Sequence, residues 1–172
     1  MAKSAKELNE KAYALAKKYE FEHGNCAQCV FAAVTETLGA ENADVFRAAT
    51  GFADGIGLSG DGHCGSLSGA VMAISYFFGR KREEFPRRGK MMKALLLSRQ
   101  LLSAFMAKYG VCRCHELQTK FYGIFYNLLD PAELEAAVKA GVLERYSSLA
   151  GQVAGMAVEL ILEQQEKDAA KT

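Results

Sequence analysis

The feature that most constrains this chain is a glycine-rich loop in its first half. From Gly51 to Gly69 the sequence reads GFADGIGLSGDGHCGSLSG, with seven glycines in nineteen positions. Glycine permits positive φ and lets the backbone come close to a ligand or to another helix. The segment that follows, LSGAVMAISYFF, carries apolar residues at helical spacing. The loop is therefore expected to deliver Cys64 to the start of a helix over residues 64–78.

The rest of the chain is typical of an all-α protein. Only two prolines occur in 172 residues, strand-like alternation is hard to find, and Ala, Leu, Lys and Glu dominate. A chain of this length can bury one apolar core. We predict a single-domain, orthogonal helical bundle of about six to eight helices over residues 1–172, with a frayed tail at 166–172. The expected helices cover 4–22, 26–38, 43–50, 64–78 and 92–109, then one from 112–114 to 122, one opening at Pro131 and one from about 142.

Local capping patterns support two of these helix starts. Ser4 with Glu7, and Asn25 with Gln28, both have the spacing of a capping box. The second pattern makes Cys26 the first residue of its helix. A connector over residues 79–90 contains Pro86, which suits the first turn of a helix.

Two pairs of glycines, each four residues apart, predict close helix packing. Gly65 with Gly69 and Gly151 with Gly155 each lie on one helical face and leave space for a neighbouring helix. Gly65 and Gly69 also follow Cys64 closely, so they are candidates for contact with a cofactor.

Charge and hydropathy exclude several classes of partner. The formal net charge is +1, from 21 basic and 20 acidic residues, so no general field attracts nucleic acid or an anionic membrane. No window resembles a membrane span and the first twenty residues do not resemble a signal peptide. We therefore expect a cytoplasmic protein. Five cysteines without an export signal favour metal binding or thiol chemistry over a disulfide framework.

Three cysteines fall at predicted helix starts: Cys26, Cys64 and one of Cys112 or Cys114. A helix N-terminus favours negative charge, so a low thiol pKa is expected there, as metal ligation and redox reactivity both require. All three histidines of the chain also lie beside cysteines, at His23, His63 and His115. The alternative interpretation is that the thiols only pack as small apolar groups.

Three blocks of the sequence resemble a known family. NCAQCVFAAVTETLG, HCGSLSGAVMAISYFFGR and KYGVCRCHEL are similar to the leading blocks of redox-active proteins with spaced cysteines around a CGAxxG motif, the C_GCAxxG_C_C family. Cys64, Gly65 and Gly69 match the motif, with Ser66 where the family usually has alanine. Cys26 matches the first family cysteine and Cys114 the third. The resemblance implies a helical protein with a redox or iron–sulfur role, similar to the non-haem part of split-Soret-type cytochromes.

The fourth family cysteine is missing from this chain. It is expected near residues 146–148, where the sequence reads YSS, and no cysteine follows Cys114. Cys29, Cys112 or His115 could complete a ligand set, since mixed histidine and thiolate ligation occurs in zinc and iron–sulfur sites. Cys29 also forms a CxxC with Cys26, and on a helix the two can share a face.

Two chemical hypotheses follow, with a structural one beside them. The first is an iron–sulfur cluster or another thiophilic metal, used for electron transfer or redox sensing. The second is metal-free thiol–disulfide chemistry, with Cys64 and Cys26 as the reactive residues; the third is a helical module with inert thiols. The sequence assigns no enzymatic reaction and no specific redox partner, and it leaves a homodimer open. The candidate metal ligands are Cys26, Cys29, Cys64, Cys112, Cys114 and His115.

Overall fold

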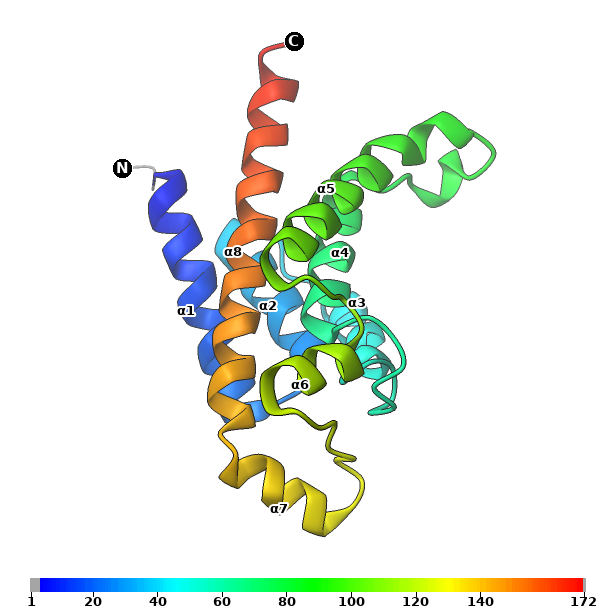
Figure 1. The fold of residues 1–172 in the computed structure, drawn as a ribbon. Helices are drawn as coiled ribbons and strands as arrows, with labels where there is room; N and C mark the ends of the chain where they lie inside the picture. The colour runs from blue at the N-terminus through cyan, green and yellow to red at the C-terminus, as the bar shows by residue number, and fades with distance from the viewer. Residues whose placement is uncertain (1–3, 172) are drawn as a thin grey trace.

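Helix α8 (Val142–Ala169) is the longest element of the computed structural model, which describes residues 4–171. Helix α1 (Ala5–His23) lies antiparallel along it, so that both chain ends lie on the same side of the molecule (Figure 1). Gly151 and Gly155 face α1, because a Cβ at Gly151 would meet Tyr13 at 2.8 Å and a Cβ at Gly155 would meet Asn9 at 2.7 Å. The prediction that these glycines permit close packing is confirmed.

Within residues 4–171, eight α-helices and three short 3₁₀ segments account for the regular structure, and an isolated bridge is the only β pairing described. The prediction of an all-α bundle is confirmed. The remaining elements are α2 (Cys26–Leu38), α3 (Ala43–Ala48), η1 (Ala49–Phe52), α4 (Gly65–Phe78), η2 (Arg82–Glu84), η3 (Arg88–Met91), α5 (Met92–Tyr109), α6 (Cys114–Tyr122) and α7 (Pro131–Lys139).

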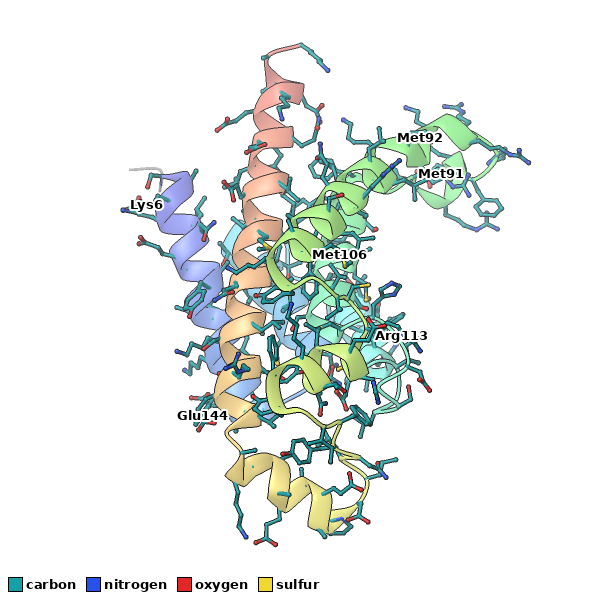
Figure 2. All side chains as sticks on the ribbon, viewed as in Figure 1. Lys6, Met91, Met92, Met106, Arg113 and Glu144 are labelled. Carbon is teal, nitrogen blue, oxygen red and sulfur yellow. The ribbon has the colours of Figure 1, made fainter. Side chains whose placement is uncertain are left out.

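The core is formed where α2 and α4 pack against α1 and α8. Phe31 of α2, Ile74 of α4 and Val153 of α8 are fully buried in one apolar cluster. Helix α5 adds Leu101 and Phe105 to this cluster, and its first half extends away from the bundle with the 79–91 connector (Figure 1). Met91 and Met92, labelled in Figure 2, lie on this extension. No helix of the described residues is long and apolar enough to cross a membrane.

Gly65 and Gly69 set the distance between α4 and α2. A Cβ at Gly69 would collide with the backbone carbonyl of Ala27, and a Cβ at Gly65 would collide with the sulfur of Cys26. Both positions lack space for any side chain. The close approach that the glycine spacing predicts is therefore present, and it holds Cys26 against the start of α4.

Three local expectations differ from the structure. Asn25 caps α2 through a hydrogen bond from the Gln28 backbone, but the Gln28 side chain donates to the Phe46 carbonyl and to Thr50 instead of closing a capping box. Pro86 lies in the turn between η2 and η3 and does not open a helix. Helix α8 continues to Ala169, well into the expected tail.

Replacing Gly69 with leucine tests the packing of α4 on α2. The added side chain has no space beside the Ala27 backbone, so we expect the free energy of unfolding to fall by about 1–3 kcal/mol, as in other overpacked cores. Urea denaturation followed by circular dichroism measures the change. The matched control is Gly89→Leu, because a Cβ at Gly89 meets no atom within 4 Å. Equal stability of the two variants would contradict the packing role of Gly69.

Candidate functional site

Three backbone hydrogen bonds join the glycine-rich loop to the start of α6, one of them from the His115 N–H to the Gly60 carbonyl at 2.9 Å. The Cys64 N–H donates to the Cys112 carbonyl at 2.8 Å, and the Cys114 N–H donates to the Gly62 carbonyl at 3.0 Å. These last two bonds run in opposite directions, so the two segments pair like a short antiparallel ladder. Cys64, the N-cap of α4, and Cys114, the first residue of α6, are thereby held side by side.

The bridge between His63 and Arg113 belongs to the same pairing. The Arg113 side chain, labelled in Figure 2, reaches back to the loop and donates to the Asp61 carbonyl at 3.0 Å. It also forms an exposed ion pair with the Asp61 carboxylate. Exposed pairs contribute little to stability, so Arg113 mainly fixes the position of the loop.

The loop has an unusual backbone from Asp54 to Leu58. All five residues in this run have positive φ, including the non-glycine residues Asp54, Ile56 and Leu58. This left-handed turn is closed by its own backbone bonds, among them Gly60 N–H to the Asp54 carbonyl and Gly62 N–H to the Gly55 carbonyl. Such a backbone persists only where the surrounding structure holds it.

Asp54 connects two of the thiols. The Cys114 thiol donates to Asp54 Oδ1 at 2.7 Å, and the Gln118 amide donates to the same oxygen at 3.1 Å. The backbone of Asp54 also lies near the Cys26 thiol and acts to lower its pKa, against the larger effect of burial. One loop residue therefore lies near both the first residue of α2 and the first residue of α6.

Cys64 completes the group of thiols. Its side chain lies at the start of α4 but forms no capping hydrogen bond to the first turn of that helix. Charge on Cys64 would raise the pKa of both Cys26 and Cys114, so the three thiols lie within electrostatic reach of one another. All three side chains are buried and none forms a disulfide. The structure thus brings together the three cysteines that the helix starts and the family motif single out, while their roles as ligands stay a prediction.

A cavity of about 350 Å³ opens beside Cys26 and Cys114. Three oxygens of its lining residues are buried without a hydrogen-bond partner: Glu20 Oε2, Asp54 Oδ2 and the Tyr146 hydroxyl. Buried polar atoms in native proteins normally have partners. These three oxygens are therefore polar atoms that the described residues leave without a partner.

The thiols are not acidified, contrary to the expectation from their helix starts. Burial raises the pKa of Cys64 to about 11, although the N–H groups of Ser66 and Leu67 act in the opposite direction. Burial also raises the pKa of Cys26 and the pKa of Cys114 well above the usual value. Desolvation of the thiolate therefore outweighs the helix terminus, and the thiols are protonated in the protein without a bound cation.

The two acids of the cluster behave in the same way. Burial, with the nearby charge of Asp54 as a smaller cause, raises the pKa of Glu20 to about 7. Burial also raises the pKa of Asp54, against the hydrogen bonds from Cys114 and Gln118. No Lys, Arg or His is among the described residues that line the cavity. The thiols and carboxyl groups of the cluster can each become negatively charged, and no described residue of the cavity lining carries a positive charge.

The other candidate ligands lie outside this group of thiols or at its edge. The Cys29 thiol is buried and donates to the Gly24 carbonyl at 2.9 Å; burial, and after it the nearby Glu20 carboxylate, raises its pKa. Cys112 is partly exposed and contributes its backbone carbonyl. The exposed ring of His115 packs against Phe125, with ring centroids 5.1 Å apart. His23 and His63 are likewise exposed, so none of the histidines next to cysteines in the sequence is buried with them.

The side chains of the site are of the kind that bind a thiophilic metal, but they are not arranged as a metal site in this structure. Three soft sulfur ligands and an orphaned carboxylate oxygen are of the kind that zinc or iron–sulfur clusters use. Among residues 4–171, however, no group of three or more His, Cys, Asp or Glu side chains is arranged to hold a metal ion. Binding would require deprotonation and side-chain rotation of the cysteines.

Three residues of this site were missed by sequence reasoning. Glu20 follows Ala12 and Ala16 at intervals of four on the buried face of α1, and an acid in that position is a usable signal. Tyr146 stands where the fourth family cysteine is expected, and it lines the cavity. No sequence pattern indicates that Asp54 belongs to the site, because its position depends on the left-handed backbone of the loop.

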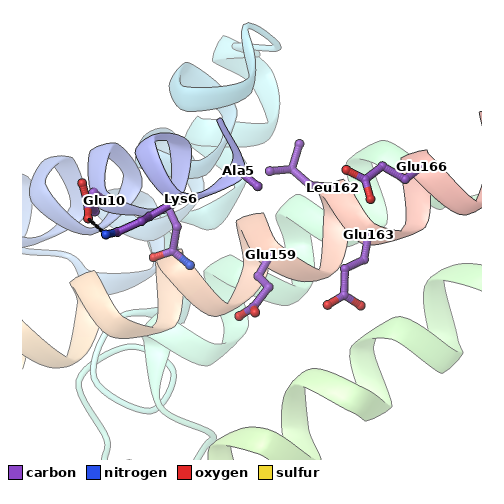
Figure 3. A pocket seen from close by; sticks show the side chains of 8 residues that line it. Ala5, Lys6, Glu10, Glu159, Leu162, Glu163 and Glu166 are labelled. Carbon is purple, nitrogen blue, oxygen red and sulfur yellow. Dashed lines mark ion pairs between the residues drawn. The ribbon is translucent and has the colours of Figure 1, made fainter. Parts of the chain in front are cut away.

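A second hollow, of about 480 Å³, lies between α1 and α8 near the chain ends (Figure 3). Its lining includes Glu10, Glu159, Glu163 and Glu166 but no cysteine. It is therefore separate from the cluster of thiols.

The comparisons with known proteins agree with the site. The model of the family described as "Putative redox-active protein (C_GCAxxG_C_C)" matches residues 24–160. This match includes the three clustered cysteines and Tyr146. A search of curated proteins and a search of solved structures each found no match.

The raised pKa of Glu20 predicts a pH-dependent stability. Between its ordinary value of 4.5 and about 7, the folded protein holds a proton that the unfolded chain has released. Stability is therefore greatest below this window and decreases as the pH rises through it. We expect the metal-free protein to lose up to about 3 kcal/mol of unfolding free energy from this group between about pH 5 and about pH 8.

Urea denaturation of chelator-treated wild type and Glu20→Gln at both pH values measures this effect. The variant should lose much less stability with rising pH, since glutamine does not ionise. Glu159→Gln, which removes an exposed acid of α8, should retain the wild-type dependence. An unchanged pH dependence in Glu20→Gln would show that Glu20 is not the titrating group.

Proposed function

The chain belongs to the C_GCAxxG_C_C family of redox-active proteins, and we propose that it holds a thiophilic metal or an iron–sulfur cluster through Cys26, Cys64 and Cys114. The observation that carries this proposal is the cluster itself. Cys26 and Cys114 line one cavity with Glu20 and Asp54, and Cys64 lies within electrostatic reach of both thiols. Electron transfer or redox sensing is the use that fits this family.

The missing positive charge favours a cationic group at the site. Protonated thiols and carboxyl groups in a buried cluster can all release protons when a metal ion supplies the opposite charge. Thiolate ligation then offsets the desolvation that keeps the thiols neutral. When bound, an iron–sulfur cluster would supply a one-electron couple, and a zinc ion would supply only structure or Lewis acidity.

Each residue of the cluster has its own part in this proposal. Cys26, Cys64 and Cys114 are the ligands, and Asp54, hydrogen-bonded to Cys114 at 2.7 Å, is placed to accept its thiol proton. Cys29 is the nearest candidate for a fourth ligand among the three left open by the sequence, because it is buried and lies near Glu20. Gly65 gives the Cys26 sulfur room beside α4, so Gly65 and Gly69 support the site through packing.

A second candidate function is metal-free thiol–disulfide chemistry through Cys64 and Cys26. One observation favours it: the backbone N–H groups of Leu67 and Ser66 act to lower the pKa of Cys64, as they would for a thiolate. The pKa of about 11 argues against a reactive thiol at neutral pH. Metal binding therefore remains the first proposal.

Anaerobic purification of the wild type and of Cys64→Ser tests the metal proposal. We expect the wild type to contain iron or zinc by elemental analysis, with visible absorption if iron is bound. Cys64→Ser should lose most of the metal while its helical circular dichroism persists, because Cys64 is one small side chain of a large apolar core. Cys112→Ser is the control, since the Cys112 thiol is partly exposed and should not be needed.

Thiol titration separates the alternatives. A resolving pair predicts that mild oxidation removes a pair of free thiols in the wild type but not in Cys64→Ser, and that chelators have no effect. Metal-free wild type that titrates all five thiols in both redox states would contradict both chemical functions.

A further inference from the structure

We propose that the cavity beside Cys26 and Cys114 binds a small organic amine, with its ammonium group among Glu20, Asp54 and Tyr146 and its apolar part against α7 and the start of α8. This site goes beyond the metal proposal. It shares two cysteines with it but requires no metal.

The polar side of the cavity matches an ammonium group. Glu20 Oε2, Asp54 Oδ2 and the Tyr146 hydroxyl are orphaned oxygens on side chains that are no more than 8% exposed. A primary ammonium carries three N–H donors and can supply one to each of these oxygens. It also brings the positive charge that the described lining residues lack.

The other carboxylate oxygen of Asp54, Oδ1, already accepts hydrogen bonds from the protein, which leaves Oδ2 for an ammonium group. Asp54 Oδ1 accepts from both the Cys114 thiol and the Gln118 amide. Gln118 in turn is fixed, because its carbonyl oxygen accepts from the Tyr126 N–H at 3.0 Å. The carboxylate is therefore oriented by the protein, and Oδ2 remains for a ligand.

The rest of the cavity is apolar and comes from different elements. Leu134 and Val138 of α7, Val142 and Leu143 of α8, and Leu58 of the loop line it. The side chains of Leu134 and Val138 are also 45% and 60% exposed, so this wall faces solvent on its outer side. A volume of about 350 Å³ is in the range of small-molecule sites. A bare metal ion or a free ammonium ion would leave this apolar space unfilled.

Isothermal titration of the reduced, chelator-treated full chain with 2-phenylethylamine tests the proposal. The neutral isostere 2-phenylethanol is the matched probe, because it fills the same apolar space without charge. We expect the amine to bind at least roughly tenfold more tightly than the alcohol. Glu20→Gln and Asp54→Asn should each weaken amine binding roughly tenfold and leave alcohol binding nearly unchanged.

Glu159→Gln in the acidic hollow near the chain ends serves as the control and should bind the amine like the wild type. Circular dichroism confirms that each variant folds. Equal binding of amine and alcohol, or loss of amine binding in Glu159→Gln but not in Glu20→Gln, would overturn the proposal. The titration uses metal-free protein, so failure to bind the amine would not contradict the metal proposal. Likewise, finding no metal in the purified wild type would not contradict the amine site.

Discussion

The antiparallel backbone pairing between Cys64 and Cys112, and between Cys114 and Gly62, is the constraint on which the site depends. Neither segment belongs to a sheet, so these bonds have no neighbouring ladder to replace them. They hold the start of α4 against the start of α6, and they also fix the path of the glycine-rich loop that precedes α4. The positions of Asp54, Cys64 and Cys114 all follow from that one junction.

Much of the fold could be predicted because its signals are local. The residues that cap helices act on their own first turn, so Asn25 and Asp130 mark the starts of α2 and α7 to the residue. Glycines at a spacing of four predicted the close packing of α4 on α2 for a similar reason. The Gln28 side chain was the exception, since its partners belong to α3 and η1 and could not be known from its own helix.

The chemistry of the site was harder to predict because it depends on burial. A helix terminus stabilises a negative charge by about 0.3–1 kcal/mol at an exposed position, whereas taking an ion out of water costs several kcal/mol. The first effect can be read from sequence and the second cannot. Cys26, Cys64 and Cys114 therefore lie at helix starts as predicted, but the predicted direction of their pKa shift was wrong. Glu20 joins them from α1, a helix with no cysteine of its own.

The left-handed run from Asp54 to Leu58 shows where stability and function compete in this protein. A left-handed backbone costs a non-glycine residue about 1–2 kcal/mol, and glycine would remove that cost at positions 54 and 58. Yet Asp54 supplies a carboxylate to the cavity and Leu58 supplies part of its wall. Glycine at either position would relieve the backbone and erase a side chain of the site, so selection for stability alone would favour a different loop from the one this chain has.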